Sequence, residues 1–123
     1  MDPGHAWIVD AFGCDPQRLR SATAPAAVFA ACVAELSLTP VAAAVWHAFP
    51  EPGGVTGFLL LSESHLSVHT FPETGFAALD LYCCRSRADW PWAERLKDLL
   101  GASAVVVRTL ARGRGAPTPA ATR

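Results

Sequence analysis

Short apolar runs of strand length, separated by turn residues, dominate the pattern of hydrophobic and polar positions along this chain. Such runs, bounded by Gly, Pro, Asp or Ser, are typical of β-strands. They predict strands over residues 6–12, 41–49, 55–62, 65–71, 76–84 and 104–110. The connections in the middle of the chain are only a few residues long, which favours antiparallel hairpins over parallel crossovers.

Two segments carry the apolar spacing of a helix instead, with apolar residues recurring every three or four positions. The first is the Ala-rich stretch 16–38, in which the main helix is expected after Pro25 because proline disrupts a helix interior. The second begins after Asp89, the expected N-cap, and carries its apolar face over residues 92–100.

This order of elements predicts an α+β fold, a two-layer sandwich of an antiparallel sheet with two helices on one face. With both helices on one face, the other face of the sheet would be exposed to water. Because the strands are this apolar, two copies are expected to dimerise into a larger sandwich. A single domain is expected over residues 1–110, and the tail 111–123, rich in Gly, Pro, Ala and Arg, is expected to be disordered.

Composition narrows the classes of function. A formal net charge of −1 over 123 residues gives no reason to expect a nucleic-acid partner. No apolar run approaches the roughly 20 residues that span a bilayer, and the first residues lack the layout of a signal peptide. We therefore expect a cytoplasmic protein with neither a nucleic-acid nor a membrane partner.

The segment around Glu63, Ser64 and His65 is the candidate for chemistry. A serine that follows an acidic residue between two strands, close to histidines, could attack its own preceding peptide bond. If residues 72–75 form a hairpin turn, the strand register puts Cys83 opposite Ser64 and Cys84 opposite Glu63. A one-residue slip would exchange the two cysteines, so the residues alone leave open which thiol lies beside the serine.

His69 lies five residues beyond Ser64, which is about 16 Å along an extended strand. It therefore reaches Ser64 only if the strand kinks or if His69 serves a second copy of the chain. His65 and His69 would be about 13 Å apart, too far to share a metal ion, and the cysteines form no Cys-x-x-Cys pair, so no metal site is expected. A hydrolase triad of Ser64, His69 and Asp80 lacks the Gly-x-Ser-x-Gly turn.

A long motif carries a family resemblance. Residues 63–73 read Glu-Ser-His-Leu-Ser-Val-His-Thr-Phe-Pro-Glu, the match continues over 75–84, and weaker matches lie at 9–15, 47–49 and 54–57. The chain resembles prokaryotic S-adenosylmethionine decarboxylase in these residues. The resemblance implies a proenzyme that cleaves itself into a β chain, 1–63, and an α chain, 64–123. It also implies a pyruvoyl cofactor derived from Ser64, which forms a Schiff base with the substrate amine.

The resemblance implies a role for each matching residue. Glu63 supplies the carbonyl at the cleavage site, His69 assists processing, and Thr56 takes the place of a family serine with the same task. Cys84 matches the cysteine that returns a proton to the decarboxylated carbon.

The substrate implied is S-adenosylmethionine, whose decarboxylated product feeds spermidine synthesis. Phe49 would stack on adenine, Glu73 would hold the ribose hydroxyls, and Leu61 would line the same pocket. The partner implied is a second processed αβ protomer, because in the family the site lies between the two protomers of a dimer.

Several departures from the family pattern bear on substrate choice. Thr56 replaces a serine, Phe71 replaces a tryptophan, and Arg85 stands where glycine is common. Two alternatives therefore stay open: a pyruvoyl-dependent decarboxylase of arginine or ornithine, and a non-catalytic homolog that regulates an active partner.

Overall fold

The computed structural model describes residues 3–84, 89–115 and 117 of the chain. Within these residues the elements are β1 (His5–Phe12), α1 (Pro16–Leu19), α2 (Thr23–Leu36), β2 (Val45–Ala48), β3 (Val55–Leu61), β4 (Ser64–Phe71), β5 (Phe76–Cys83), α3 (Trp92–Leu100) and β6 (Ala104–Ala111). Arg85 and the end of the expected tail, 116 and 118–123, lie outside the described residues.

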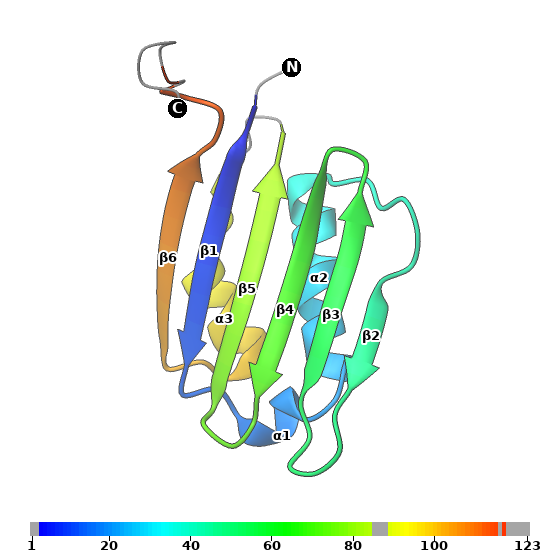
Figure 1. Ribbon diagram of the computed structural model, residues 1–123. Coiled ribbons are helices and arrows are strands. Elements are labelled where there is room, and N and C mark those ends of the chain that lie inside the picture. The colour runs from blue at the N-terminus through cyan, green and yellow to red at the C-terminus, as the bar shows by residue number, and fades with distance from the viewer. Residues whose placement is uncertain (1–2, 85–88, 116, 118–123) are drawn as a thin grey trace.

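The strands form one antiparallel sheet in the order β2-β3-β4-β5-β1-β6. Figure 1 shows α2 and α3 packed across a single face of this sheet. The predicted α+β class, the antiparallel sheet and the one-sided helices are confirmed. The described residues also contain a third helix, the short α1, whose N-cap Asp15 accepts a hydrogen bond from the amide of Gln17. No helix in this part of the chain is long and apolar enough to span a membrane.

Alternation along the strands builds the core. In β4 the side chains of Leu66 and Val68 are fully buried, and their neighbours in sequence are not. Leu79 of β5 lies opposite Val68 and joins the same apolar cluster as Phe29 of α2 and Leu96 of α3. Fully burying each such side chain contributes about 1.5–3 kcal/mol, so this face fixes the register of the sheet.

The opposite sheet face carries no helix in Figure 1 and holds large apolar side chains. Alternation puts Phe58 and Leu60 of β3, Phe71 of β4 and Leu110 of β6 on this open face, each at least 41% exposed. An apolar face of this kind is typical of an association surface.

Two predicted boundaries were wrong. The second strand begins at Val45 instead of residue 41. The residues before it contact β3 through an isolated bridge from Pro40 to Leu61 and a hydrogen bond from the Val41 amide to Leu60, not through a continuous ladder. The helix α2 begins before Pro25, at Thr23. Proline is tolerated in the first turn because an amide hydrogen there would have no acceptor within the helix, so its loss breaks no hydrogen bond.

The predicted N-cap was also wrong. Asp89 accepts a hydrogen bond from the indole of Trp7 at 3.2 Å, and the residue that caps α3 is Pro91, which makes no side-chain cap bond. The last strand extends one residue beyond the expected domain limit, to Ala111.

Candidate functional site: two groups at opposite ends of the sheet

The serine of interest lies at a tight hairpin. Leu61 of β3 pairs with Ser64 of β4, so Ser62 and Glu63 alone form the turn between the two strands. Ser64 is 8% exposed and lies on the helix side of the sheet, in step with the buried Leu66. The peptide bond before Ser64 is therefore fixed at the junction of a turn and a strand.

The predicted β4–β5 register is confirmed. Cys83 is the cross-strand partner of Ser64, and the backbone amide of Cys84 donates a 3.0 Å hydrogen bond to the carbonyl oxygen of Glu63. Cys83 is fully buried and Cys84 is half-buried. Because successive strand residues alternate, Cys83 shares the helix side with Ser64, and Cys84 follows on from the open-face position of Tyr82.

The other two cysteines are poor candidates for chemistry. Burial raises the pKa of Cys14 to about 11 and that of Cys32 to about 12. Both thiols are therefore protonated at neutral pH, and both pack in the apolar core. Within the described residues, no three His, Cys, Asp or Glu side chains converge into a group that could hold a metal ion.

Thr56 and His69 form a second pair, nearer the other end of the sheet. They are cross-strand partners in β3 and β4, and Thr56 Oγ1 lies 3.1 Å from His69 Nδ1. His69 is exposed on the open face, where its alternation with the buried Val68 and Thr70 places it. A hydroxyl at this distance holds the imidazole in one orientation and leaves its other nitrogen, Nε2, for a further partner.

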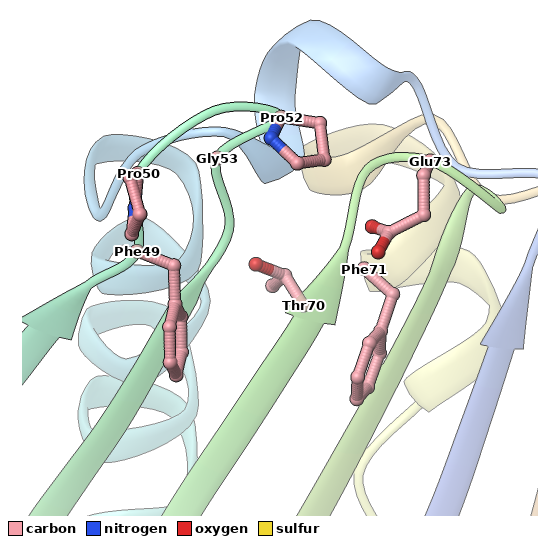
Figure 2. Close-up of a pocket in the computed structure, with 7 residues that line it drawn as sticks. All are labelled: Phe49, Pro50, Pro52, Gly53, Thr70, Phe71 and Glu73. Carbon is pink, nitrogen blue, oxygen red and sulfur yellow. The ribbon is translucent and has the colours of Figure 1, made fainter.

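A hollow of about 340 Å³ lies at the same end of β4, beginning one residue beyond His69 at Thr70. Its lining residues come from the β2–β3 turn and from the end of β4: Phe49, Pro50, Pro52, Gly53, Thr70, Phe71 and Glu73. Figure 2 shows the Thr70 side chain between the rings of Phe49 and Phe71, with the Glu73 carboxylate directed toward the same space. Two aromatic rings and a carboxylate suit a ligand that has a flat ring for stacking and hydroxyl groups that donate hydrogen bonds.

The expected site residues thus fall into two groups. The serine group holds Glu63, Ser64, Cys84 and Leu61, which is 2% exposed and far along β3 from the hollow. The hollow group holds Phe49 and Glu73, which line the hollow, and the pair of Thr56 and His69 at the same end of β3 and β4. Ser64 and His69 stand on opposite sides of β4 and about 16 Å apart along it, so one chain does not bring the groups together. The same separation argues against a triad of Ser64, His69 and Asp80.

Sequence reasoning missed several wall residues of the hollow: Thr70, Pro50, Pro52 and Gly53. The only signal for Thr70 was its position between His69 and Phe71 in the long motif. The turn residues looked like an ordinary connection.

Comparison with known proteins gives a family match. A family model described as S-adenosylmethionine decarboxylase matches residues 5–113. An S-adenosylmethionine decarboxylase proenzyme of Pyrococcus abyssi is 43% identical over 86 residues, covering 70% of this chain and 60% of that protein. A proenzyme of the same name from Symbiobacterium thermophilum is 56% identical over 66 residues, covering 53% of this chain and 50% of that protein. The chain thus spans only half to three fifths of these two relatives.

Two further matches extend over more of the chain. S-adenosylmethionine decarboxylase proenzyme 2 of Halalkalibacterium halodurans is 37% identical over 115 residues, covering 91% of this chain and 87% of that protein. The crystal structure of the adenosylmethionine decarboxylase from Aquifex aeolicus superposes with a TM-score of 0.73 at 24% identity, covering 92% and 93% of the two chains. The structural likeness establishes a shared fold.

Proposed function

Because this chain belongs to the S-adenosylmethionine decarboxylase family, we propose that it cleaves itself between Glu63 and Ser64 and then decarboxylates S-adenosylmethionine. The product, decarboxylated S-adenosylmethionine, supplies the aminopropyl group for spermidine synthesis. The observation that carries the proposal is the hydrogen bond from the Cys84 amide to the Glu63 carbonyl, beside a sheltered serine.

In the cleavage, Ser64 Oγ attacks the carbonyl carbon of Glu63, and an ester replaces the peptide bond while the hydroxyl proton passes to the freed amine. Negative charge develops on the Glu63 oxygen, where the Cys84 amide already donates. Loss of the Ser64 α-proton breaks the ester and leaves a carboxylate on Glu63, the end of the β chain. Water then releases ammonia and leaves a keto group at the start of the α chain.

The surroundings of Ser64 fit a pyruvoyl group. The residue is 8% exposed and is held from both sides by its pairing with Leu61 and Cys83, so a keto group there is shielded from solvent. When formed, the pyruvoyl group supplies the electron sink for breaking the bond between the α-carbon and the carboxyl carbon of the substrate. The thiol of Cys84, the residue that directly follows the neighbouring strand β5, is the proton donor for the product carbon.

The hollow supports the choice of substrate. Adenine stacks on Phe49, and the Glu73 carboxylate accepts hydrogen bonds from the ribose hydroxyls. Glu73 also favours a second candidate, a basic amino acid such as arginine or ornithine, because a carboxylate pairs with a distal cation. Two aromatic rings at the hollow favour the nucleoside. Leu61, at the serine end, packs beside the reacting end of the substrate.

A homodimer of processed protomers completes the site. Two sheets that stack through their open faces with strand directions reversed bring the serine group of one protomer against the hollow group of the other. The exposed Phe58, Leu60 and Phe71 supply an apolar surface for this contact. His69 then lies over the turn that carries the Glu63–Ser64 bond of the partner, which removes the separation along the strand.

The test is release of labelled carbon dioxide by the purified, processed protein. Carboxyl-labelled S-adenosylmethionine, arginine and ornithine are each supplied at equal concentration, with Ser64→Ala protein as the blank. We expect release from S-adenosylmethionine alone. Release from arginine or ornithine alone would favour the second candidate, and no release from any of them by cleaved protein would refute both.

A further inference from the structure

Thr70 is a buried polar side chain in the wall of the hollow, with only 5% of its surface exposed. Its hydroxyl accepts a hydrogen bond from the amide of Val55 at 2.9 Å and donates one to the carbonyl of Leu19 at 2.7 Å. One side chain thereby joins the end of α1, the start of β3 and the end of β4.

The first of these bonds replaces a rung of the β-ladder. The backbone pairing of β3 with β4 runs from Leu61↔Ser64 to Thr56↔His69 and does not include Val55. At the next position Val55 bonds the hydroxyl of Thr70 instead of its backbone. The chain also passes close to Thr70 here, since a Cβ on Gly54 would lie 2.8 Å from the Thr70 carbonyl oxygen. The ladder therefore ends at the position where the hollow begins.

The second bond anchors the same region to the end of α1. The amide of Gly54 donates to the carbonyl of Arg20 at 3.3 Å, next to the bond between Thr70 and Leu19. The amide of Phe49 donates to the carbonyl of Gly54 at 3.0 Å, so the turn that carries Phe49 is held through the same contacts.

From these contacts we propose that Thr70 is a positioning residue of the hollow. Its hydroxyl fixes the β2–β3 turn relative to β4, and with it the separation of Phe49 from Phe71, between which the Thr70 side chain lies in Figure 2. The pair of Thr56 and His69 is placed by the same bond, because Thr56 follows Val55 and His69 precedes Thr70. This inference rests on the proposed function, in which the hollow binds the nucleoside.

Thr70→Val tests it, because valine matches the shape of threonine and removes both hydrogen bonds. Thr70→Ser restores the hydroxyl, and Thr109→Val makes the same exchange at an exposed position of β6. The probe is 5′-deoxy-5′-methylthioadenosine, titrated by calorimetry at a temperature where thermal melting shows every variant folded. We expect the Kd of Thr70→Val to rise at least tenfold, that of Thr70→Ser to stay within threefold of wild type, and that of Thr109→Val to stay unchanged.

The outcomes separate two failures. Equal Kd values for wild type and folded Thr70→Val would overturn the positioning role and leave the proposed function standing. No binding of the probe by wild type would overturn the nucleoside assignment and this inference with it. If Thr70→Val does not fold, hydrogen exchange of the Val55 amide in wild type decides: the probe should slow it at least tenfold, and an unchanged rate would overturn the role.

Discussion

The backbone amide of Cys84 donates to the carbonyl oxygen of Glu63 across 3.0 Å, while the thiol of the same residue is free to serve another purpose. The two functions proposed for Cys84 are therefore separable. In the proposed mechanism, its amide stabilises the oxygen on which charge develops during self-cleavage, and its thiol donates a proton after decarboxylation.

Cys84→Ala keeps the amide and removes the thiol, so we expect the variant to cleave itself at close to the normal rate. Decarboxylation should fall by about 10²–10⁴-fold, the usual contribution of a positioned proton donor. Mass spectrometry measures the first property and carbon dioxide release the second. Cys83→Ala is the matched control, because Cys83 is buried opposite Ser64. A loss of turnover in Cys83→Ala alone would transfer the proton-donor role to Cys83.

Cleavage should work between chains. His69→Ala protein is expected to stay uncleaved by itself, since no chain then offers a histidine to its partner. Mixed with Ser64→Ala protein, whose His69 is intact, it should form heterodimers in which the His69→Ala chain is cut. Tagged chains separated by mass give the result. A His69→Ala chain that stays whole in verified heterodimers would contradict the shared site.

A single charged side chain, introduced by substitution, tests association through the open face. Phe58→Asp puts a carboxylate on an apolar position of β3 that is 43% exposed, where a facing sheet would bury it without a partner. We expect a monomer by light scattering that is folded but does not cleave itself. Val45→Asp is the control and should still dimerise, because Val45 lies on the edge strand β2 and is 70% exposed. A dimeric, self-cleaving Phe58→Asp protein would refute this interface.

Substrate recognition by Glu73 should show in KM. Glu73→Gln keeps the shape and removes the charge, and a hydrogen bond to a charged group contributes about 1.5–3 kcal/mol. We expect KM for S-adenosylmethionine to rise at least tenfold with self-cleavage unchanged, because Glu73 lies in the hollow and not at the serine. Steady-state kinetics measure this, and an unchanged KM would remove Glu73 from the substrate site.

The contact between α2 and α3 predicts an acid-sensitive stability. The Glu35 carboxylate accepts hydrogen bonds from Arg95 Nε at 2.9 Å and Trp90 Nε1 at 2.7 Å, and these bonds lower the pKa of Glu35 below its ordinary value of 4.5. Because the folded pKa lies below the unfolded one, this stabilisation is complete above pH 4.5 and is lost as the pH falls through the folded pKa.

Glu35→Gln should therefore lower the melting temperature at pH 7. As the pH drops below 4.5, the melting temperature of the variant should fall less than that of wild type. Glu94→Gln, in the first turn of α3, is the comparison. Parallel acid profiles for Glu35→Gln and wild type, measured by thermal unfolding, would show that Glu35 contributes nothing to acid sensitivity.

Local patterns predicted the sheet well and the hollow poorly. The alternation of β4 and the short turn before Phe76 predicted the register that the structure has, with Cys83 opposite Ser64. The structure excludes the one-residue slip that the residues alone left open. The hollow depends instead on contacts between distant residues, such as Thr70 with Leu19, 51 positions apart. Asp89 shows the same limit. Its sequence position suits an N-cap, but its carboxylate accepts a hydrogen bond from the indole of Trp7, 82 positions away.

The mass of the freshly purified chain under denaturing conditions tests the central claim most directly. Self-cleavage predicts two species: a β chain ending at Glu63 with a free carboxylate, and an α chain whose first residue is a pyruvoyl group in place of Ser64. Ser64→Ala protein should give a single full-length species. A wild-type chain that stays whole on long incubation as a dimer would contradict the account.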